Sequence, residues 1–230
     1  MVKLSLLIIF LIQTISFSLS PVIQVFGQTE KITPFVEVIE ENLEEFAFNK
    51  TIPEEIRDVA LLALSHYPEL LEVEIHFQLQ NKIRGSVMQA QPKISSLIFD
   101  RKGNRSYRVK ISRYLELLDE RLPIEELPEE VLLGWLGHEL GHIKDYLDRS
   151  AVNMVAFGVQ YIFSDRFVSQ VEITADSHSV ANGLGKAIIA TKDFVLNHDR
   201  LPEGYKNKIR SLYMSPGEVF SLVDVEEDEE

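Results

Sequence analysis

The sequence contains no cysteine among its 230 residues. Disulfide bonds are therefore excluded, and so is any metal site built from thiolate ligands. A metal ion in this protein would have to be held by carboxylates and by histidines, of which the chain has six. Histidines and acidic residues at defined spacings are consequently the candidates for a metal site.

Basic residues are scarce relative to acidic ones. The chain has 23 Lys and Arg against 36 Asp and Glu, which gives a formal net charge of −13 at pH 7. Because a nucleic-acid backbone is recognised by clustered Lys and Arg, we expect no nucleic-acid partner. The 45% hydrophobic and 26% charged residues are typical of a globular protein, and the length fits one compact domain.

Long apolar runs are also rare. The first extends from Leu4 to about Leu19 behind the single basic residue Lys3, and small residues follow at Val25 and Gly27. This order predicts an export signal peptide, residues 1–27, and an exported protein that is extracellular, periplasmic or at the cell surface. An uncleaved membrane anchor is the alternative, and only in that case do we expect contact with a membrane.

The apolar run 151–163 is too short to cross a bilayer and contains Asn153 and Gln160. This disfavours a further membrane-embedded segment after residue 27.

Composition divides the remaining chain into an acidic N-terminal segment, residues 28–52, a domain, residues 53–216, and an acidic tail, residues 217–230. The chain is predicted to loosen at Ser215-Pro216-Gly217, and the run from Asp224 to Glu230 is predicted to be solvated and disordered.

The domain is predicted to have an α+β fold. A helix begins at Pro53, because proline and acidic residues favour the first helical turn. Three strands follow at residues 72–80, 94–102 and 105–112, the last two joined as a hairpin at Gly103-Asn104, which together make a small antiparallel sheet. After Pro123 helical spacing dominates to the end of the domain, which predicts a mainly helical subdomain.

The motif "HELGH" lies on the first of these helices. His138 and His142 are four residues apart, so their imidazoles lie on one helix face and can reach one metal ion at about 2.0–2.1 Å. Glu139 is rotated by about 100° and can act on a water molecule beside the ion without being a ligand. This arrangement is typical of zinc-dependent peptidases.

A catalytic zinc site needs a third protein ligand and one open position. Thirty residues after His142, in "VEITAD", Glu172 can supply that ligand. Asp176 lies one turn further on and can accept a hydrogen bond from the free N–H of His138 or His142. A solvated helix face is the alternative interpretation for Glu172 and Asp176, and their pairing with the upstream motif favours the site.

Two further residues are candidates for donating a hydrogen bond to the transition-state oxyanion. His178 follows Asp176 by two residues, although this offset favours the opposite side of the helix. Tyr213 has a hydroxyl suited to the same role, but a packed aromatic ring is the simpler interpretation. Trp135 is expected to pack the motif helix onto its neighbours.

These motifs resemble the gluzincin metallopeptidases related to the CAAX prenyl proteases and the HtpX-type membrane peptidases, and are most similar to their small soluble relatives, the minigluzincins. The resemblance covers about residues 53–216 and also includes "HYPEL", "MQAQP" and "YKNKIRSLYMSP". It implies a gluzincin-like fold and one catalytic zinc ion held by His138, His142 and Glu172, with Glu139 as the catalytic glutamate. The export signal, the acidic segment and the acidic tail depart from the family.

The predicted function is hydrolysis of a peptide or protein substrate by a zinc endopeptidase, with Glu139 as general base and residues 86–91 as the rim against which an extended peptide pairs. A zinc-binding scaffold with a blocked cleft is the alternative from another class. A cytosolic regulatory peptidase is opposed by the export signal. The acidic tail suggests latency if one of its carboxylates enters the cleft, and the oligomeric state stays open.

Overall fold

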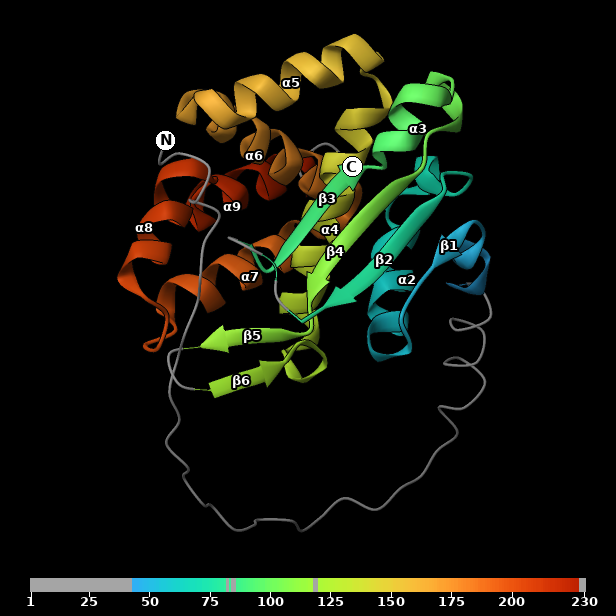
Figure 1. The fold of residues 1–230 in the computed structure, drawn as a ribbon. Helices are drawn as coiled ribbons and strands as arrows, with labels where there is room; N and C mark the ends of the chain where they lie inside the picture. Colours follow the sequence, from blue (N-terminus) through green and yellow to red (C-terminus); the bar gives the residue numbers. More distant parts are fainter. Residues whose placement is uncertain (1–42, 82, 84–85, 118–119, 228–230) are drawn as a thin grey trace, which may run out of the picture.

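The computed structural model describes residues 43–81, 83, 86–117 and 120–227 (Figure 1). The predicted signal peptide, residues 1–27, and most of the acidic segment lie outside the described residues. What is described of that segment contains the short 3-10 helix η2 (Glu44–Ala47) and the strand β1 (Lys50–Thr51).

Among the described residues, none of the helices combines the length and the apolar character that crossing a membrane requires.

The helical region predicted from Pro53 is present. It consists of the 3-10 helix η3 (Glu54–Ile56), the helix α2 (Arg57–Ser65) and the 3-10 helix η4 (Pro68–Leu70). Ala60, Ala63 and Leu64 lie on one face of α2 and are buried. This face packs against α4, the helix that carries the motif.

The main sheet is mixed and has four strands, β1, β2 (Ile75–Gln80), β4 (Tyr107–Ser112) and β3 (Met88–Pro92) in spatial order. β1 and β2 are parallel, β2 and β4 are parallel, and β3 is antiparallel to β4. The predicted sheet of three antiparallel strands is therefore not confirmed. The fold mixes helices and strands, as predicted, but its sheet has another topology.

The predicted hairpin is wrong because residues 94–99 form the helix α3 (Ile94–Phe99), followed by the 3-10 helix η5 (Lys102–Asn104). The apolar residues Ile94, Leu97 and Ile98 follow the helical i, i+3, i+4 pattern, but the β-branched isoleucines and the aromatic Phe99 suggested a strand instead. The antiparallel partner of β4 is "MQAQP", which contains no β-branched residue and ends in proline. Neither feature predicts a strand.

A second sheet pairs β5 (Tyr114–Leu117) with β6 (Glu120–Pro123) in antiparallel register, and the 3-10 helix η6 (Ile124–Glu126) follows. Seven helical elements follow among the described residues, and the first six are α4 (Glu129–Leu147), α5 (Ala151–Phe163), α6 (Asp165–Ser179), the π-helical turn η7 (Val180–Leu184), α7 (Gly185–Asn197) and α8 (Glu203–Leu212). Helix α9 (Pro216–Glu227) is the last described element.

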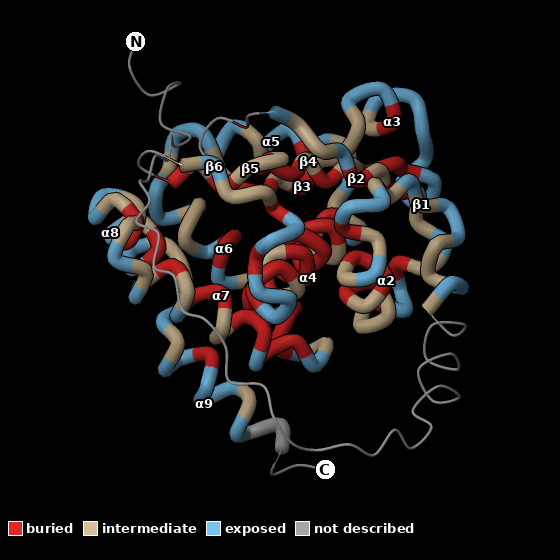
Figure 2. The backbone as a smooth tube through the Cα atoms, turned by 90° about the horizontal axis from the view of Figure 1, so that it is seen from below, coloured by how far each residue is buried: buried red, intermediate tan, exposed pale blue. Residues whose placement is uncertain are grey.

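The motif helix α4 lies at the centre of the molecule. Figure 2 shows it largely buried, with the strands on one side and α2, α6 and α7 near it. Two glycines allow this close packing: a Cβ added at Gly141 would lie 2.5 Å from the carbonyl oxygen of Ala175 on α6, and one at Gly134 would overlap Ala187 on α7. The two histidines of the motif are thus held between a sheet and two helices.

The C-terminal segment differs from its prediction. The chain does not loosen at residues 215–217, because α9 begins at Pro216. Val219 is fully buried against Val180 and Ile188, which anchors the first turns of α9. Asp224 lies within this helix and is exposed, and residues 228–230 lie outside the described part of the chain.

Candidate metal centre

Helix α4 places both histidines of the motif on one face. The two imidazoles are buried, each residue retaining 7% of its surface, and their ring centroids are 4.7 Å apart at an interplanar angle of 87°. The backbone of this helix is also anchored by Tyr67, whose hydroxyl donates a hydrogen bond to the carbonyl oxygen of Gly137. The motif histidines therefore have a fixed position in the core.

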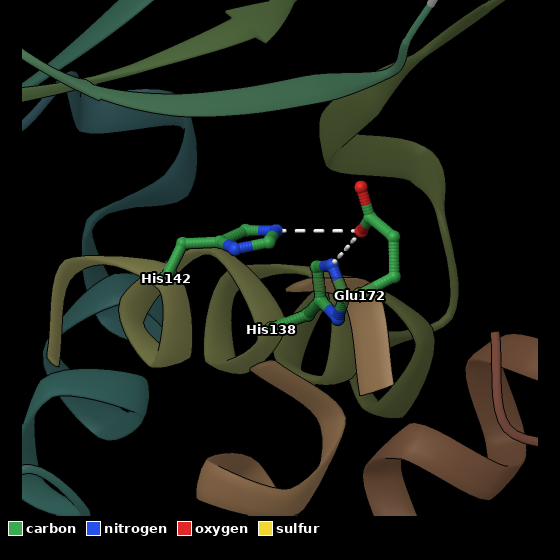
Figure 3. Close-up of side chains that lie close together, drawn as sticks. All are labelled: His138, His142 and Glu172. Atoms are coloured by element: carbon green, nitrogen blue, oxygen red, sulfur yellow. Dashed lines mark hydrogen bonds and ion pairs between the residues drawn. The ribbon is translucent and has the colours of Figure 1, made fainter. Parts of the chain in front are cut away.

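Glu172 on α6 meets both histidines (Figure 3). Its Oε2 atom lies 3.0 Å from Nε2 of His138 and 3.4 Å from Nε2 of His142. The α4–α6 contact that brings the carboxylate here is the close approach at Gly141. The structure thus brings together the three residues proposed from the sequence as metal ligands.

The ligand atoms fit a metal ion of zinc's size. The three atoms lie within 4.8 Å of one another, and all three residues are buried. Two ligands bound at 2.0–2.1 Å in tetrahedral geometry are roughly 3.3 Å apart, and the two nitrogen–oxygen separations here lie on either side of that value. Two imidazoles and one carboxylate are also a donor set that zinc accepts. The residues could therefore hold one metal ion.

Asp176 orients His138 as the sequence predicts. Its Oδ1 atom lies 2.9 Å from Nδ1 of His138, while its Oδ2 atom accepts a hydrogen bond of 2.7 Å from Nζ of Lys192 on α7. Burial would raise the pKa of Asp176, but His138 and Lys192 outweigh it and lower that pKa. The buried carboxylate is thus ionised and can fix Nδ1 of His138 as a donor, which leaves Nε2 of His138 free for a metal.

Tyr161 is a residue that the sequence reasoning missed. Its hydroxyl, on α5, donates a hydrogen bond of 2.7 Å to Oε1 of Glu172. Burial raises the pKa of Tyr161, so its hydroxyl stays protonated. The bond occupies one carboxylate oxygen of Glu172 and turns the other towards the histidines. No spacing signal pointed to Tyr161, because α5 meets α6 only in the folded chain.

His142 departs from this pattern. Its Nδ1 atom is buried and has no hydrogen-bond partner within the described residues. Its ring stacks on Tyr146, with centroids 6.1 Å apart. Packing therefore fixes the orientation of this ring, in contrast to the carboxylate that orients His138.

Glu139 points towards the strand β3. Its Oε2 atom accepts a hydrogen bond from the backbone N–H of Ala90. Burial is the largest influence on its carboxyl group and raises its pKa, although the neighbouring histidines lower it in part. Glu139 thus lies next to the candidate ligands without being one of them, as the motif predicts.

These groups form one wall of a cavity of about 350 Å³. Residues 86–91, predicted as the rim, line it, and so do Met154, Phe157 and Tyr161 on α5. Apolar and aromatic side chains thus form much of the lining, and the polar side chains of Gln89, Gln91 and Lys208 line the cavity in addition to the candidate ligands.

The other predicted residues separate into two groups. Tyr213, just after α8, lines the cavity, and its ring centroid lies 5.6 Å from that of His138. Trp135 packs edge to face on Phe194 of α7, at 6.2 Å between centroids, and also lines the cavity. His178 is not among the lining residues, and its neighbours include Lys144 and Asp145. His142 is also close enough to lower the pKa of His178, and the oxyanion role of His178 stays a prediction.

Comparison with models of known protein families, with curated proteins and with solved structures found no match for this chain. The similarity to gluzincins accordingly rests on the sequence motifs named above and stays a prediction.

Proposed function

We propose that the protein is a zinc-dependent endopeptidase. The observation that carries the proposal is the convergence of His138, His142 and Glu172 on the wall of a cavity that Glu139 also lines. Metal binding alone does not require Glu139. A carboxylate beside the ligands, held by a backbone N–H and buried, is suited to moving protons during hydrolysis.

A zinc ion in this site would supply Lewis-acid polarisation of a peptide carbonyl and would lower the pKa of water towards 7. The chain's own residues supply the proton transfers. Glu139 accepts a proton from the attacking water and passes it to the leaving amine, and its raised pKa makes it a stronger base than an exposed carboxylate. Tyr213 lines the same cavity and is the candidate donor to the developing oxyanion.

The strand β3 supports an extended polypeptide as the substrate. β3 is at the edge of the main sheet, hydrogen-bonded to β4, and its residues line the cavity. An exposed strand edge can bind a peptide by adding it to the sheet. Such pairing would place a peptide along β3 next to Glu139, whose carboxylate is already bonded to Ala90.

A digest of an unbiased peptide library tests this function. The wild-type chain, loaded with zinc, is compared with Glu139→Gln and with the control Glu130→Gln, which changes an exposed glutamate in the first turn of the same helix. We expect Glu139→Gln to bind zinc and to lose roughly 10²- to 10⁴-fold in cleavage rate, the range that acid–base catalysis contributes. Glu130→Gln should cleave normally.

Undiminished cleavage by Glu139→Gln contradicts the assignment of the base. Zinc binding without cleavage by the wild type would instead favour the scaffold function, in which the cleft binds a partner.

A further inference from the structure

The helix α5 is apolar on two opposite faces. Its inner face contributes Met154 and Phe157 to the cavity. Its outer face carries Val152, Val155 and Val159, all exposed and repeating at helical spacing. Asn153 and Gln160 are the exposed polar residues of α5, and three valines exposed on one helix face are an unusual surface for a monomer in water.

The helix α3 adds a second apolar surface. Ile94 and Ile98 are each about two-thirds exposed, and Phe99 is 83% exposed. On α5, Phe163 is 71% exposed at the C-terminal end. None of the 19 residues in α3 and α5 is charged, in a chain of which 26% is charged.

Both helices border the mouth of the cavity. Ile94 and Leu97 of α3 line it, as do Gly158 and Tyr161 of α5. Figure 1 shows α3 and α5 at the same end of the molecule, at the top of the view. The exposed apolar residues of these two helices are called the rim patch below, and the helices that carry them also line the cavity of the candidate metal centre.

We infer that the rim patch docks the protein onto the surface of a lipid bilayer. The 13 residues of α5 span roughly 20 Å at 1.5 Å per residue, less than the ~30 Å of a hydrocarbon core, so the helix lies in the interface and does not cross it. Exposed residues of both charges stand at the helix ends: Asp100, Arg101 and Lys102 follow α3, and Asp165 and Arg166 follow Phe163. Lys102 also pairs with Asp148, so the two ends suit the zwitterionic headgroups of an uncharged lipid surface. The long basic side chains can extend their charge to the headgroups while the apolar face enters the acyl boundary.

The composition of the chain favours lipid over the other occupants of an apolar patch. A second copy would bring together two chains that each carry a net charge of −13, whereas an uncharged lipid surface opposes no charge. The apolar segment from Leu4 to Leu19 is predicted to direct the chain to a membrane, as a signal peptide or as an anchor. The rim patch then keeps the cavity entrance at the membrane surface.

Docking on a bilayer would also determine which substrates the proposed peptidase meets. This inference about substrates rests on the proposed function. With the rim patch in the interface, the cavity opens towards polypeptide segments that lie at the bilayer surface. Substrates attached to a membrane, or unfolded segments with apolar side chains, would be concentrated at β3. Soluble folded proteins would not.

The absence of native cysteine allows a local test. Single cysteines are introduced by Phe99→Cys and Val155→Cys in the rim patch, and by Phe48→Cys and Phe220→Cys at exposed positions outside it as matched controls. Each full-length variant carries an environment-sensitive fluorophore. Quenching by iodide is then measured before and after addition of phosphatidylcholine vesicles. The measurement does not require catalysis, and the same labels in a Glu139→Gln background should behave identically.

Docking predicts that vesicles protect the labels at positions 99 and 155 from iodide by roughly threefold or more, because the patch enters the lipid interface. Labels at positions 48 and 220 should stay accessible. Equal accessibility at all four positions overturns the inference, even if the N-terminal segment holds the chain on the vesicle. Protection at 99 and 155 without lipid also overturns it, since a second copy or another segment of the chain then covers the patch.

Discussion

Lys192 and Asp176 form a buried ion pair, with Nζ and Oδ2 2.7 Å apart, and the other oxygen of Asp176 contacts Nδ1 of His138. The pair joins α6 and α7 to the motif helix. One carboxylate thus links a cation that the sequence did not single out to a candidate metal ligand. Substitutions of Asp176 and Lys192 should therefore change the metal affinity and the stability of the protein.

Asp176→Asn should weaken zinc binding by roughly 10- to 100-fold, the usual cost of losing a carboxylate that orients a ligating histidine. The substitution keeps the shape of the side chain but leaves Lys192 buried without its counter-ion, so the folded fraction of the variant is checked before the titration. The exposed Asp148, whose side chain is 98% accessible, offers the control Asp148→Asn. Competition titration with a chelating dye measures both affinities, and equal affinities would remove Asp176 from the site.

Lys192→Met should destabilise the folded chain, by less than the about 3–5 kcal/mol typical of a buried charge left alone, because it removes one of the two groups, Lys192 and His138, that stabilise the buried Asp176 carboxylate. Chemical denaturation of the metal-free protein measures this change. The double variant Asp176→Asn/Lys192→Met should recover much of the loss, since it leaves no unpaired charge. A single variant as stable as the wild type would show that the ion pair contributes nothing.

Tyr161→Phe removes the hydrogen bond to Oε1 of Glu172 and little else. We expect zinc affinity to fall by about tenfold, since Glu172 can then rotate and its second oxygen loses a partner. Thermal unfolding without metal should change far less than the affinity does. An unchanged affinity would mean that packing alone orients Glu172.

Gly141→Ala should separate α4 from α6, because the new Cβ would lie 2.5 Å from the carbonyl oxygen of Ala175. Backbone cannot yield as a flexible side chain can, so Glu172 moves away from the histidines and both stability and zinc affinity fall. Gly158→Ala on α5 is the matched control. No atom lies within 4 Å of its added Cβ, and it should stabilise the helix by about 0.5–1 kcal/mol. Equal stability and equal zinc affinity of the two variants would show that the close approach of α4 and α6 at Gly141 does not position Glu172.

The carboxylate of Glu74 should contribute to the free energy of unfolding, and this contribution should be lost at acid pH. Hydrogen bonds from His76, Lys93 and Ser106 lower its pKa to about 2. The contribution is complete above the unfolded pKa of about 4.3 and is lost as the pH falls through about 2. Its side chain is 48% exposed, so screening limits the effect to about 1 kcal/mol or less. Glu74→Gln should therefore narrow the difference in unfolding free energy between pH 7 and pH 2, and an unaltered difference would contradict this.

The parts of the site that could be predicted are those set by local geometry. His138 and His142 share a face because four residues make about one helical turn, and Glu172 and Asp176 have the same spacing. Lys192, Tyr161 and the N–H of Ala90 could not be found in this way. Each reaches the site from another element, and its position depends on how α5, α7 and β3 pack on α4 and α6.

The topology of the main sheet could not be predicted from local sequence patterns either. β2 and β4 were predictable from their β-branched and aromatic residues, but their parallel pairing depends on a crossover through β3 and α3. The apolar residues of α3 suggested a strand because a sheet core was expected to bury them. In the structure they are exposed at the cavity mouth, which no pattern of hydrophobicity indicates.

Elemental analysis of the purified chain tests the central claim most directly, alongside Glu172→Ala and the control Glu130→Gln. The account predicts one zinc ion per chain in the wild type and in Glu130→Gln, and loss of most of it in Glu172→Ala. A wild-type chain that binds no zinc when the metal is supplied, or a Glu172→Ala variant that retains it fully, would contradict the account.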